Sequence, residues 1–423
     1  MILAHGKIYD TDHTAEILEN LVDDTNRTLA EKRIGAEEVV AAAQTVAERI
    51  ASGAYDDIIN GFDFDGIDEY VSKAVGMLKR DILLLNLKAQ LPHLCELPEI
   101  DSYLSPVGVL FHIAAGNIDV LPAYSVLSGL ICGNVNVLKL PSQDDGITVK
   151  ILEEFIKILP EAADFIYVFD TPSSDVLSMI KMAEAADRIV VWGGDEAVSA
   201  VRRLAPPSVG IVEWGHRISF AYVGAGYNDR PDELRGLAEH IIKTSQMLCS
   251  SCQRIYVDSS DPGAADGFCR DFLPYLQAAR DAHPLRDIGA AAEATLLKYA
   301  AGIEGSLSGE EKSGERKYYG RGCSLTAKDD TELEISGFFG NCDVSALPLS
   351  KLFSVLRRKK GYLQTACIIA DEETAKKAED IMVRAGVNRV TTPAKMSDTF
   401  IGEAHDGSFE LQHYVRVINK CRE

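Results

Sequence analysis

The chain has 423 residues, 46% of them hydrophobic and 25% charged, which is enough for two or three domains with substantial cores and excludes extensive disorder. Its formal net charge is −21 and no lysine- or arginine-rich run is present, so nucleic-acid binding is not expected, because a phosphate backbone would be repelled. The first residues lack the features of a signal peptide. Nine scattered cysteines favour reduced thiols in the cytoplasm over a disulfide framework.

The first hundred residues are predicted to be helical, with the clearest helical patterns at 36–51 and 68–91. Beyond Pro106, short apolar runs alternate with helical patterns. The most apolar region, 107–140, is broken by Gly, Asn and Pro and therefore does not predict a membrane span. Strands are expected at 107–113, 135–140, 165–169, 188–192 and 209–212, and helices at 121–132, 147–159, 174–185 and 196–204. Such uniformly apolar strands predict a parallel sheet covered on both faces, with ligands at the carboxyl ends of its strands.

A second α/β segment begins at Asp229. A loop rich in Gly, Ser and charged residues is expected at 302–322. The remaining predicted elements are helices at 237–247, 264–279 and 373–385 and strands at 253–257, 363–370 and 387–391.

Cys249 stands in a small polar turn between the helix predicted at 237–247 and an apolar strand. This place would keep a thiol fixed and accessible, as covalent catalysis requires; a buried structural cysteine is the alternative. Cys252 completes a CxxC pair. Zinc would need a second such pair, which the sequence lacks, and a redox dithiol would need a helix after the motif, so no metal site is predicted.

Four other polar motifs follow predicted strands. Asn117 is a candidate donor to an oxygen that gains negative charge, or a helix cap. Lys139 can reach ribose or phosphate groups, or be solvated. Gly193 and Gly194 would let backbone N–H groups approach a pyrophosphate, although they do not match the GxGxxG fingerprint. Glu213 is a candidate general base or a solvated strand end.

The order of these motifs resembles that of the aldehyde dehydrogenase superfamily and, within it, of the LuxC-type acyl-CoA reductases. The resemblance spans about 106–416. Its motifs are AAGN at 114–117, GLICGNVNVLKLPSQD at 129–144, VWGGDEAV at 191–198, LCSSCQRIYV at 248–257, GYLQTA at 361–366 and HDG at 405–407.

The resemblance implies an aldehyde-dehydrogenase-like α/β fold, in which two doubly wound parallel domains enclose a cleft and follow a helical N-terminal region. We place the helical region and the cofactor-binding domain at 1–225 and the catalytic domain at 226–400. The C-terminal tail, 401–423, would return to the first domain or form an oligomer interface.

For catalysis, the resemblance makes Cys249 the nucleophile. Asn117 and the backbone N–H of Cys249 would form the oxyanion hole, and Glu213 aligns with the superfamily's general base. Cys252 stands where relatives commonly have proline and could resolve oxidised Cys249. His405 is a family marker, for which a structural role is expected.

For the cofactor, the resemblance assigns Lys139 to the adenosine ribose or its 2′-phosphate, and Gly193 and Gly194 to the phosphates. Glu334 is a weak match to the glutamate that holds the second ribose. Ser142 replaces a glutamate that is frequent in NAD-specific members, which favours NADPH, with NADH still compatible.

The predicted function is NADPH-dependent reduction of an acyl thioester, from acyl-CoA or an acyl-carrier protein, to the aldehyde through an acyl-cysteine. There are three alternatives. The first is NAD(P)-dependent oxidation of a free aldehyde, which the presence of Glu213 favours. The others are a γ-glutamyl phosphate reductase and a non-catalytic cofactor-binding scaffold. We expect a cytoplasmic homo-oligomer with no membrane span and no nucleic-acid partner. An acyl-transferring partner protein is compatible with this function.

Overall fold

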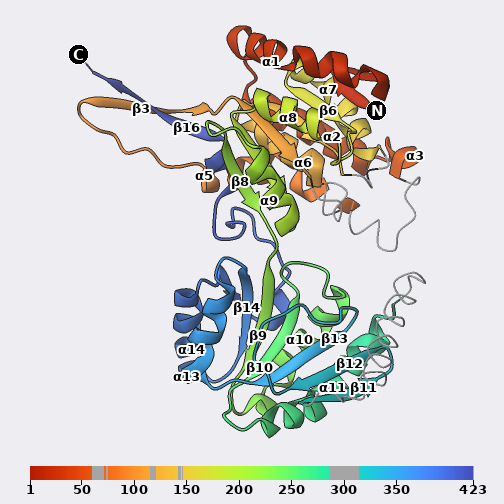
Figure 1. Ribbon diagram of the computed structural model, residues 1–423, viewed down its shortest axis with the longest axis vertical. Coiled ribbons are helices and arrows are strands. Elements are labelled where there is room, and N and C mark those ends of the chain that lie inside the picture. The colour runs from red at the N-terminus through yellow and green to blue at the C-terminus, as the bar shows by residue number, and fades with distance from the viewer. Residues whose placement is uncertain are drawn as a thin grey trace. The chain divides into compact units, whose positions relative to one another are not determined.

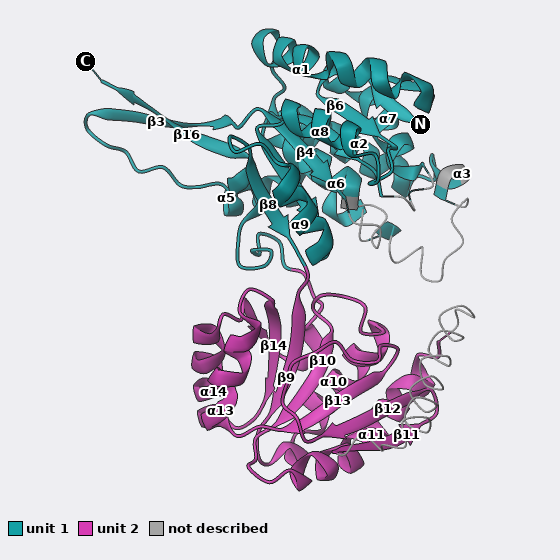
Figure 2. Ribbon diagram, in the orientation of Figure 1, with its two compact units in different colours: residues 1–215, 400–423 teal, residues 216–399 magenta. Residues whose placement is uncertain are grey.

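The computed structural model describes residues 1–59, 71–72, 75–114, 121–141, 144, 146–285 and 314–422. The chain forms two compact units (Figures 1 and 2). Unit 1 comprises Met1–Gly215 and Phe400–Glu423, and unit 2 comprises His216–Thr399. Unit 2 thus begins at His216 rather than at 226, because the strand at 218–223 pairs within the second sheet.

Unit 1 contains a seven-stranded sheet of order β2-β1-β6-β5-β4-β7-β8. Its five parallel strands lie where the sequence predicts them, and the first three are fully buried, as expected for a sheet covered on both faces. These strands are β4 (Val109–Ile113), β5 (Val135–Lys139), β6 (Ile166–Phe169), β7 (Arg188–Trp192) and β8 (Gly210–Trp214). The helices between them are α6 (Leu121–Ile131), α7 (Ile147–Ile158), α8 (Val176–Ala185) and α9 (Asp195–Leu204).

The strand order of unit 1 reverses at its centre. From β4 the chain moves outward to β5 and β6, and then returns to place β7 on the other side of β4. At such a switch point the loops after the two central strands diverge and leave a crevice at the carboxyl ends of the strands. Here the loops begin at Ala114 and Gly193.

The first hundred residues are not wholly helical, which corrects the sequence prediction. Short strands β1 (Ile2–Ala4) and β2 (Lys7–Tyr9) extend the sheet of unit 1 in antiparallel orientation. A separate antiparallel ribbon pairs β3 (Ile100–Pro106) with β16 (Val415–Cys421) and projects from the rest of unit 1 (Figure 1). The helices of this region are α1 (Thr14–Glu31), α2 (Ala36–Ala51), α3 (Asp56–Ile59) and α5 (Arg80–Gln90).

Unit 2 contains a second seven-stranded sheet, of order β11-β12-β13-β10-β9-β14-β15, in which only the edge strand β11 is antiparallel. The predicted loop at 302–322 is wrong for its last part, where β11 (Glu315–Gly320) forms; residues 302–313 lie outside the described part of the chain. The other strands are β9 (Ile218–Val223), β10 (Cys252–Val257), β12 (Cys323–Lys328), β13 (Asn341–Ala346), β14 (Leu363–Ile369) and β15 (Arg389–Thr391).

Helices pack on both faces of this second sheet. One apolar cluster joins the sheet to α10 (Pro231–Lys243) and α11 (Gly263–Ala282), and another joins it to α13 (Leu349–Leu356) and α14 (Glu372–Ala385). Across the described residues of both units, no helix combines the length and apolar character needed to cross a membrane.

Candidate active site

Cys249 lies near the apex of a tight turn that precedes β10. The Ser251 N–H donates to the Leu248 carbonyl (2.9 Å), and the Ser251 hydroxyl oxygen accepts from the Leu248 N–H (3.1 Å). Ser251 and Cys252 are fully buried, whereas Cys249 is exposed. The turn therefore anchors its second half in the core and presents the sulfur of Cys249.

The backbone before this turn is strained, and this corrects the predicted helix at 237–247. Helix α10 ends at Lys243, after which Ser245 (φ 48°) and Gln246 (φ 62°) adopt the left-handed conformation. Phe338 (φ 53°) and Phe339 (φ 52°) do the same, and the Phe339 N–H donates to the Ser245 carbonyl (2.9 Å). Left-handed non-glycine residues persist where the surroundings fix them and concentrate at functional sites.

Two buried amide side chains fix this strained region. Gln246 Nε2 donates to the Cys252 carbonyl (3.0 Å) and to Ser336 Oγ (2.7 Å), while the Gly340 N–H donates to Gln246 Oε1 (3.1 Å). Gln253 Nε2 donates to the Gln246 carbonyl (2.7 Å), and Gln253 Oε1 accepts from the Ser336 N–H (3.1 Å). Because these groups are neutral, the geometry of the turn does not depend on their ionisation.

His240 on α10 holds the turn from another side. Its Nε2 accepts the Cys252 N–H (3.1 Å), so Nδ1 carries the ring proton and faces Ser397 Oγ (3.4 Å). Ser397 in turn hydrogen-bonds Ser250 (3.0 Å). Burial lowers the pKa of His240 to about 4. The imidazole is therefore neutral and is already used to bind the backbone, so it is not placed to deprotonate the thiol.

Two further side chains contact Cys249 directly. Gln364 Nε2 donates to Cys249 Sγ (3.2 Å), and Ser219 Oγ donates to the Cys249 carbonyl (2.7 Å). Sequence reasoning did not assign these residues or His240. Gln364 lies within the GYLQTA motif, which was the only signal for it, since a glutamine in a strand has no distinctive pattern.

The sulfur of Cys252 is directed into the core. It contacts the Arg254 carbonyl (3.5 Å) and interacts with the thiol of Cys342 on the neighbouring strand, whose pKa is raised by this contact and by burial. All nine cysteines lie in described parts of the chain and are reduced. In those same parts, no group of three or more His, Cys, Asp or Glu side chains is arranged to hold a metal ion.

In unit 1, Lys139 is the last residue of β5 and its side chain is buried. Its ammonium donates to Ser173 Oγ (2.9 Å). Burial lowers the pKa of Lys139, and the charge of Asp170 opposes this. A buried cation bound to one neutral hydroxyl at the carboxyl edge of the sheet is suited to bind a hydroxyl or phosphate group.

Gly193 and Gly194 link β7 to α9. The Gly193 N–H donates to the Trp214 carbonyl (3.2 Å), and Gly194 is the N-cap of the helix. A Cβ built on Gly194 would meet no atom within 4 Å, so the backbone there is accessible. Asp195 and Glu196 occupy the first turn of α9, and their carboxylates weaken the attraction of this helix N-terminus for an anion.

The remaining predicted residues stand apart from these contacts. The carboxylate of Glu213 is bound by both arms of the Arg202 guanidinium, with Nη2–Oε2 at 2.6 Å. Glu334 is exposed in the loop before β13. Asn117 and Ser142 lie outside the described residues.

His405 belongs to an aromatic cluster in unit 1. Its ring centroid lies 5.2 Å from that of Trp192 and 4.9 Å from that of Trp214, and its Nε2 lies 3.8 Å from the Asp406 carboxylate. These contacts connect the C-terminal segment to the ends of β7 and β8, which is compatible with the structural role expected for His405.

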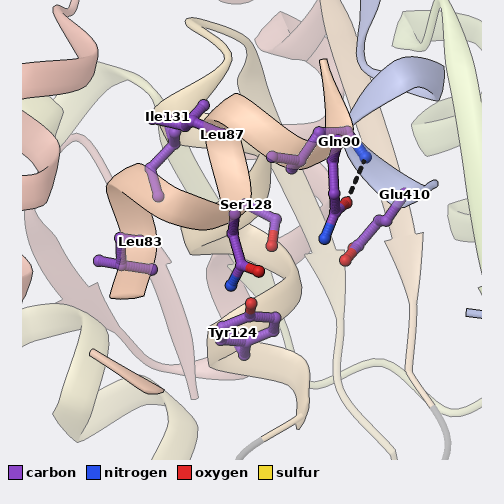
Figure 3. Close-up of a pocket in the computed structure, with 9 residues that line it drawn as sticks. Leu83, Leu87, Gln90, Tyr124, Ser128, Ile131 and Glu410 are labelled. Atoms are coloured by element: carbon purple, nitrogen blue, oxygen red, sulfur yellow. Dashed lines mark hydrogen bonds between the residues drawn. The ribbon is translucent and has the colours of Figure 1, made fainter. Parts of the chain in front are cut away.

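A small pocket in unit 1 lies between α5, α6 and the C-terminal segment (Figure 3). Gln90 accepts the Leu411 N–H (3.2 Å) beside Glu410, and burial raises the pKa of the Glu410 carboxyl to about 7. The pocket has room for about one water molecule and not for an acyl chain.

Comparison with known proteins identifies relatives along most of the chain. The sequence profile described as "Acyl-CoA reductase (LuxC)" matches residues 33–417. The long-chain acyl-protein thioester reductase of Aliivibrio fischeri is 25% identical over 345 residues, which cover 77% of this chain and 67% of the relative. Long-chain acyl-protein thioester reductase 2 of Photobacterium leiognathi is 26% identical over 349 residues, with the same coverage.

Solved aldehyde dehydrogenases have the same fold. Betaine aldehyde dehydrogenase from Staphylococcus aureus, in complex with NAD+, superposes with a TM-score of 0.68 at 13% identity, covering 97% of this chain and 87% of that chain. Delta-pyrroline-5-carboxylate dehydrogenase from Mycobacterium tuberculosis gives a TM-score of 0.65 at 14% identity, covering 98% and 84%. The predicted aldehyde-dehydrogenase-like α/β fold is confirmed.

Proposed function

The chain belongs to the acyl-CoA reductase (LuxC) family and is an oxidoreductase, and from this premise we propose that it reduces a long-chain acyl thioester to the aldehyde through an acyl-Cys249 intermediate. The thioester would be that of coenzyme A or of an acyl-carrier protein. One observation carries the proposal: the sulfur of Cys249 is exposed, has an amide donor at 3.2 Å, and stands on a turn fixed by buried neutral hydrogen bonds.

The surface beside the thiol supports an apolar substrate. Met247 and Leu248, which directly precede Cys249, are 63% and 43% exposed. Adjacent exposed apolar side chains at a reactive group favour binding of hydrocarbon, and methionine adapts readily to flexible chains. We therefore propose a fatty acyl group, in keeping with the names of the relatives.

In the first step, the Cys249 thiolate attacks the thioester carbonyl. A new S–C bond forms, the bond to the carrier sulfur breaks, and the released carrier thiolate takes a proton from water. The backbone N–H of Cys249 and the side chain of Asn117 are the proposed donors to the oxyanion, a contribution of about 3 kcal/mol per donor.

In the second step, the acyl carbon is reduced while it is still bound to Cys249. A nicotinamide, when bound, supplies the hydride. The resulting oxyanion is held by the same donors until the C=O bond re-forms, and the C–S bonding pair then returns to Cys249 Sγ as the aldehyde leaves. The cysteine is a nucleophile in the first step and a leaving group in the second.

In unit 1, Lys139 suits a bound dinucleotide better than Gly193 and Gly194 do. Lys139 is buried and its ammonium donates to the neutral hydroxyl of Ser173, so it suits the adenosine ribose or its 2′-phosphate. Gly193 and Gly194 offer accessible backbone beside the switch point, but Asp195 and Glu196 oppose a phosphate there. We propose NADPH as the cofactor, with Ser142 tolerating the 2′-phosphate and Glu334 on the second ribose.

Oxidation of a free aldehyde is the second candidate, and it needs a base that activates water. Glu213 aligns with that base, but both of its oxygens are engaged by Arg202. A carboxylate whose two oxygens both accept from a guanidinium is not positioned to take a proton from an attacking water. The contact therefore favours reduction, in which no water is activated. A thiol that is exposed and accepts a hydrogen bond from a carboxamide also argues against a non-catalytic scaffold.

We propose further that the protein is a cytoplasmic homo-oligomer that receives acyl groups from a partner protein. The β3–β16 ribbon supports self-association, because it is a two-stranded sheet with exposed apolar side chains such as Tyr103 and Val417. Cytoplasmic location agrees with the reduced cysteines.

The deciding experiment uses a panel of acyl-CoAs of increasing chain length. The protein is first incubated with each thioester alone, and mass spectrometry locates the acyl group. NADPH or NADH is then added and aldehyde is measured. We expect label on the peptide that contains Cys249, aldehyde formation with NADPH, and neither in Cys249→Ala. Aldehyde formed by that variant, or acylation elsewhere, would contradict the proposal.

A further inference from the structure

We infer that Gln364 is a catalytic residue of this site, whose side-chain N–H stabilises the Cys249 sulfur as a thiolate, both when it attacks and when it leaves. The inference rests on the proposed function only in taking Cys249 as the nucleophile. The buried imidazole of His240 does not supply this stabilisation, because it is neutral and its Nε2 accepts the Cys252 N–H.

The strand pairing next to the Cys249 turn is irregular at the level of Ser219. Strand β9 lies between β10 and β14, and both ladders slip by one residue beside Ser219. Cys252 and Arg254 of β10 pair with consecutive residues of β9, and so β10 contains one extra residue. Such bulges redirect side chains and are frequent next to active sites.

The bulge in β14 contains Gln364. Leu363 pairs with Ile218 and Ala366 with Phe220, so two residues of β14 stand opposite the single residue Ser219. A regular strand would pair each with its own partner and alternate their directions. The irregularity frees Gln364 from that alternation and so allows its side chain to reach the thiol turn.

Ser219 stabilises this irregular arrangement. Its hydroxyl oxygen accepts the Thr365 N–H (3.0 Å), which replaces a ladder hydrogen bond, and its O–H donates to the Cys249 carbonyl (2.7 Å). One side chain thus ties the bulge to the thiol turn. Gln364 then places Nε2 at 3.2 Å from Cys249 Sγ, and because Gln364 is only 8% exposed its amide has little freedom to move away.

The chemistry of this contact favours the charged form of the sulfur. A thiolate accepts a hydrogen bond far better than a thiol does, so a fixed N–H donor lowers the free energy of the ionised state. An ordinary thiol is only a few per cent ionised near neutral pH, so this stabilisation raises the reactive fraction. A carboxamide does not titrate, and the donor is present at every pH.

The test measures the thiol itself in the whole protein, without substrate or cofactor. The rate of iodoacetamide alkylation is followed against pH and assigned to the peptide with Cys249, because Cys95 and Cys421 are also exposed. In Gln364→Leu we expect the midpoint of the profile to rise by about one pH unit. The rate should fall several-fold near pH 7 yet rise at the high-pH plateau, since nucleophilicity grows with basicity.

Two further variants keep the result interpretable. Gln364→Glu preserves the shape of the side chain and should raise the midpoint further, because a carboxylate repels the thiolate. Ser219→Ala removes the tie between the β14 bulge and the thiol turn, so it should raise the midpoint in the same direction as Gln364→Leu, by a smaller amount. If the midpoint stays at its wild-type value in both Gln364 variants, the inference is overturned. A shifted midpoint in a protein that forms no aldehyde would instead refute the proposed function alone.

Discussion

The candidate residues of the two sheets lie at opposite ends of the strands: at the carboxyl edge in unit 1 and at the amino edge in unit 2. In unit 1, Lys139, Gly193 and Glu213 lie at or near the carboxyl ends of β5, β7 and β8. In unit 2, Ser219 and Gln364 are second residues of β9 and β14, and the Cys249 turn enters β10, so this site lies at the amino ends. The rule that parallel sheets bind ligands at their carboxyl ends therefore applies to unit 1 and fails for the thiol.

The two edges also differ in charge. The edge of unit 1 contains the Lys139 ammonium, which suits an anionic ligand, together with several carboxylates and a guanidinium that is paired with Glu213. The contacts around the thiol turn are carboxamides, hydroxyls and a neutral imidazole. Charged groups would bind ligands in a pH- and salt-dependent way, whereas the neutral contacts keep the proposed nucleophile, Cys249, in one place. The division of labour between units predicts different consequences for mutations in each.

The largest contrast is expected within the turn itself. Cys249→Ala should reduce acyl-CoA reduction about a thousandfold or more, because it removes the nucleophile. Cys252→Ala should retain activity within a few-fold, because that sulfur is directed at the Arg254 carbonyl and at Cys342. Steady-state aldehyde formation by the two variants checks this. Equal losses would assign Cys252 a part in the chemistry.

The next largest effect is expected on stability. Gln246→Leu removes three buried hydrogen bonds and leaves the Cys252 carbonyl and the Gly340 N–H without this partner, so we expect a loss of about 3 kcal/mol in unfolding free energy. Gln90→Leu is the matched change in unit 1. It removes one bond, to the Leu411 N–H, and should cost about 1 kcal/mol. Urea unfolding compares the two, and equal losses would refute the special role of Gln246.

The sequence predicts the regular elements of this fold well and its short or polar elements poorly. Uniformly apolar runs such as 188–192 identify buried parallel strands, and β7 (Arg188–Trp192) has the predicted bounds. Three-residue strands such as β1 (Ile2–Ala4) offer too few residues for a pattern. The edge strand β11 (Glu315–Gly320) is polar and glycine-flanked, so it resembles a loop.

The residues of the site are likewise predictable only in part from the sequence. The turn of Cys249 is predictable because the residue types change abruptly there, from a helical pattern to small polar residues to an apolar run. Gln364, Ser219 and His240 act through a bulge and through contacts between distant segments, and no local pattern encodes these. The left-handed residues that end α10 at Lys243 are equally invisible, since Ser245 and Gln246 are ordinary residues in a helix.

Acid should weaken the scaffold around the thiol through His240. Its pKa is lowered to about 4 in the native state, so between about pH 6.5 and 4 the unfolded chain binds a proton that the native chain does not. The stability contributed by neutral His240 is complete above that range and is lost as pH falls through it. By pH 5 the loss is about 2 kcal/mol.

His240→Gln, which keeps an acceptor for the Cys252 N–H but cannot titrate, should lose that part of the acid sensitivity. Unfolding in urea at pH 8 and pH 5, followed by hydrogen exchange of peptides from 216–399, measures the difference. In unit 1, His112 has the same shift, but Glu410, with a pKa raised to about 7, gains its proton first in the native state and offsets it. An unchanged pH dependence in the His240 variant would contradict the assigned ring contacts.

A smaller effect is expected from the charged edge of unit 1. Lys139→Met keeps the length of the side chain and removes its charge, so we expect the KM for NADPH to rise about tenfold with little change in kcat. The alkylation profile of Cys249 should be unaffected, because the turn in unit 2 is fixed by its own contacts. A shifted profile would show that the two edges are coupled.

The smallest effect is expected at Glu213. If this carboxylate is the base of an aldehyde-oxidising enzyme, Glu213→Gln should abolish oxidation and hydrolysis of the acyl-enzyme, an effect of about a hundredfold or more. The ion pair with Arg202 predicts instead less than about a threefold change in either direction of the reaction, because an exposed ion pair contributes little and no proton passes through it. Assaying thioester reduction and aldehyde oxidation side by side decides between them. A large loss of aldehyde oxidation alone would show that Glu213, at the charged edge of unit 1, takes part in the reaction. Small changes in both activities would indicate that Glu213 is not needed for bond making and breaking at Cys249 in unit 2.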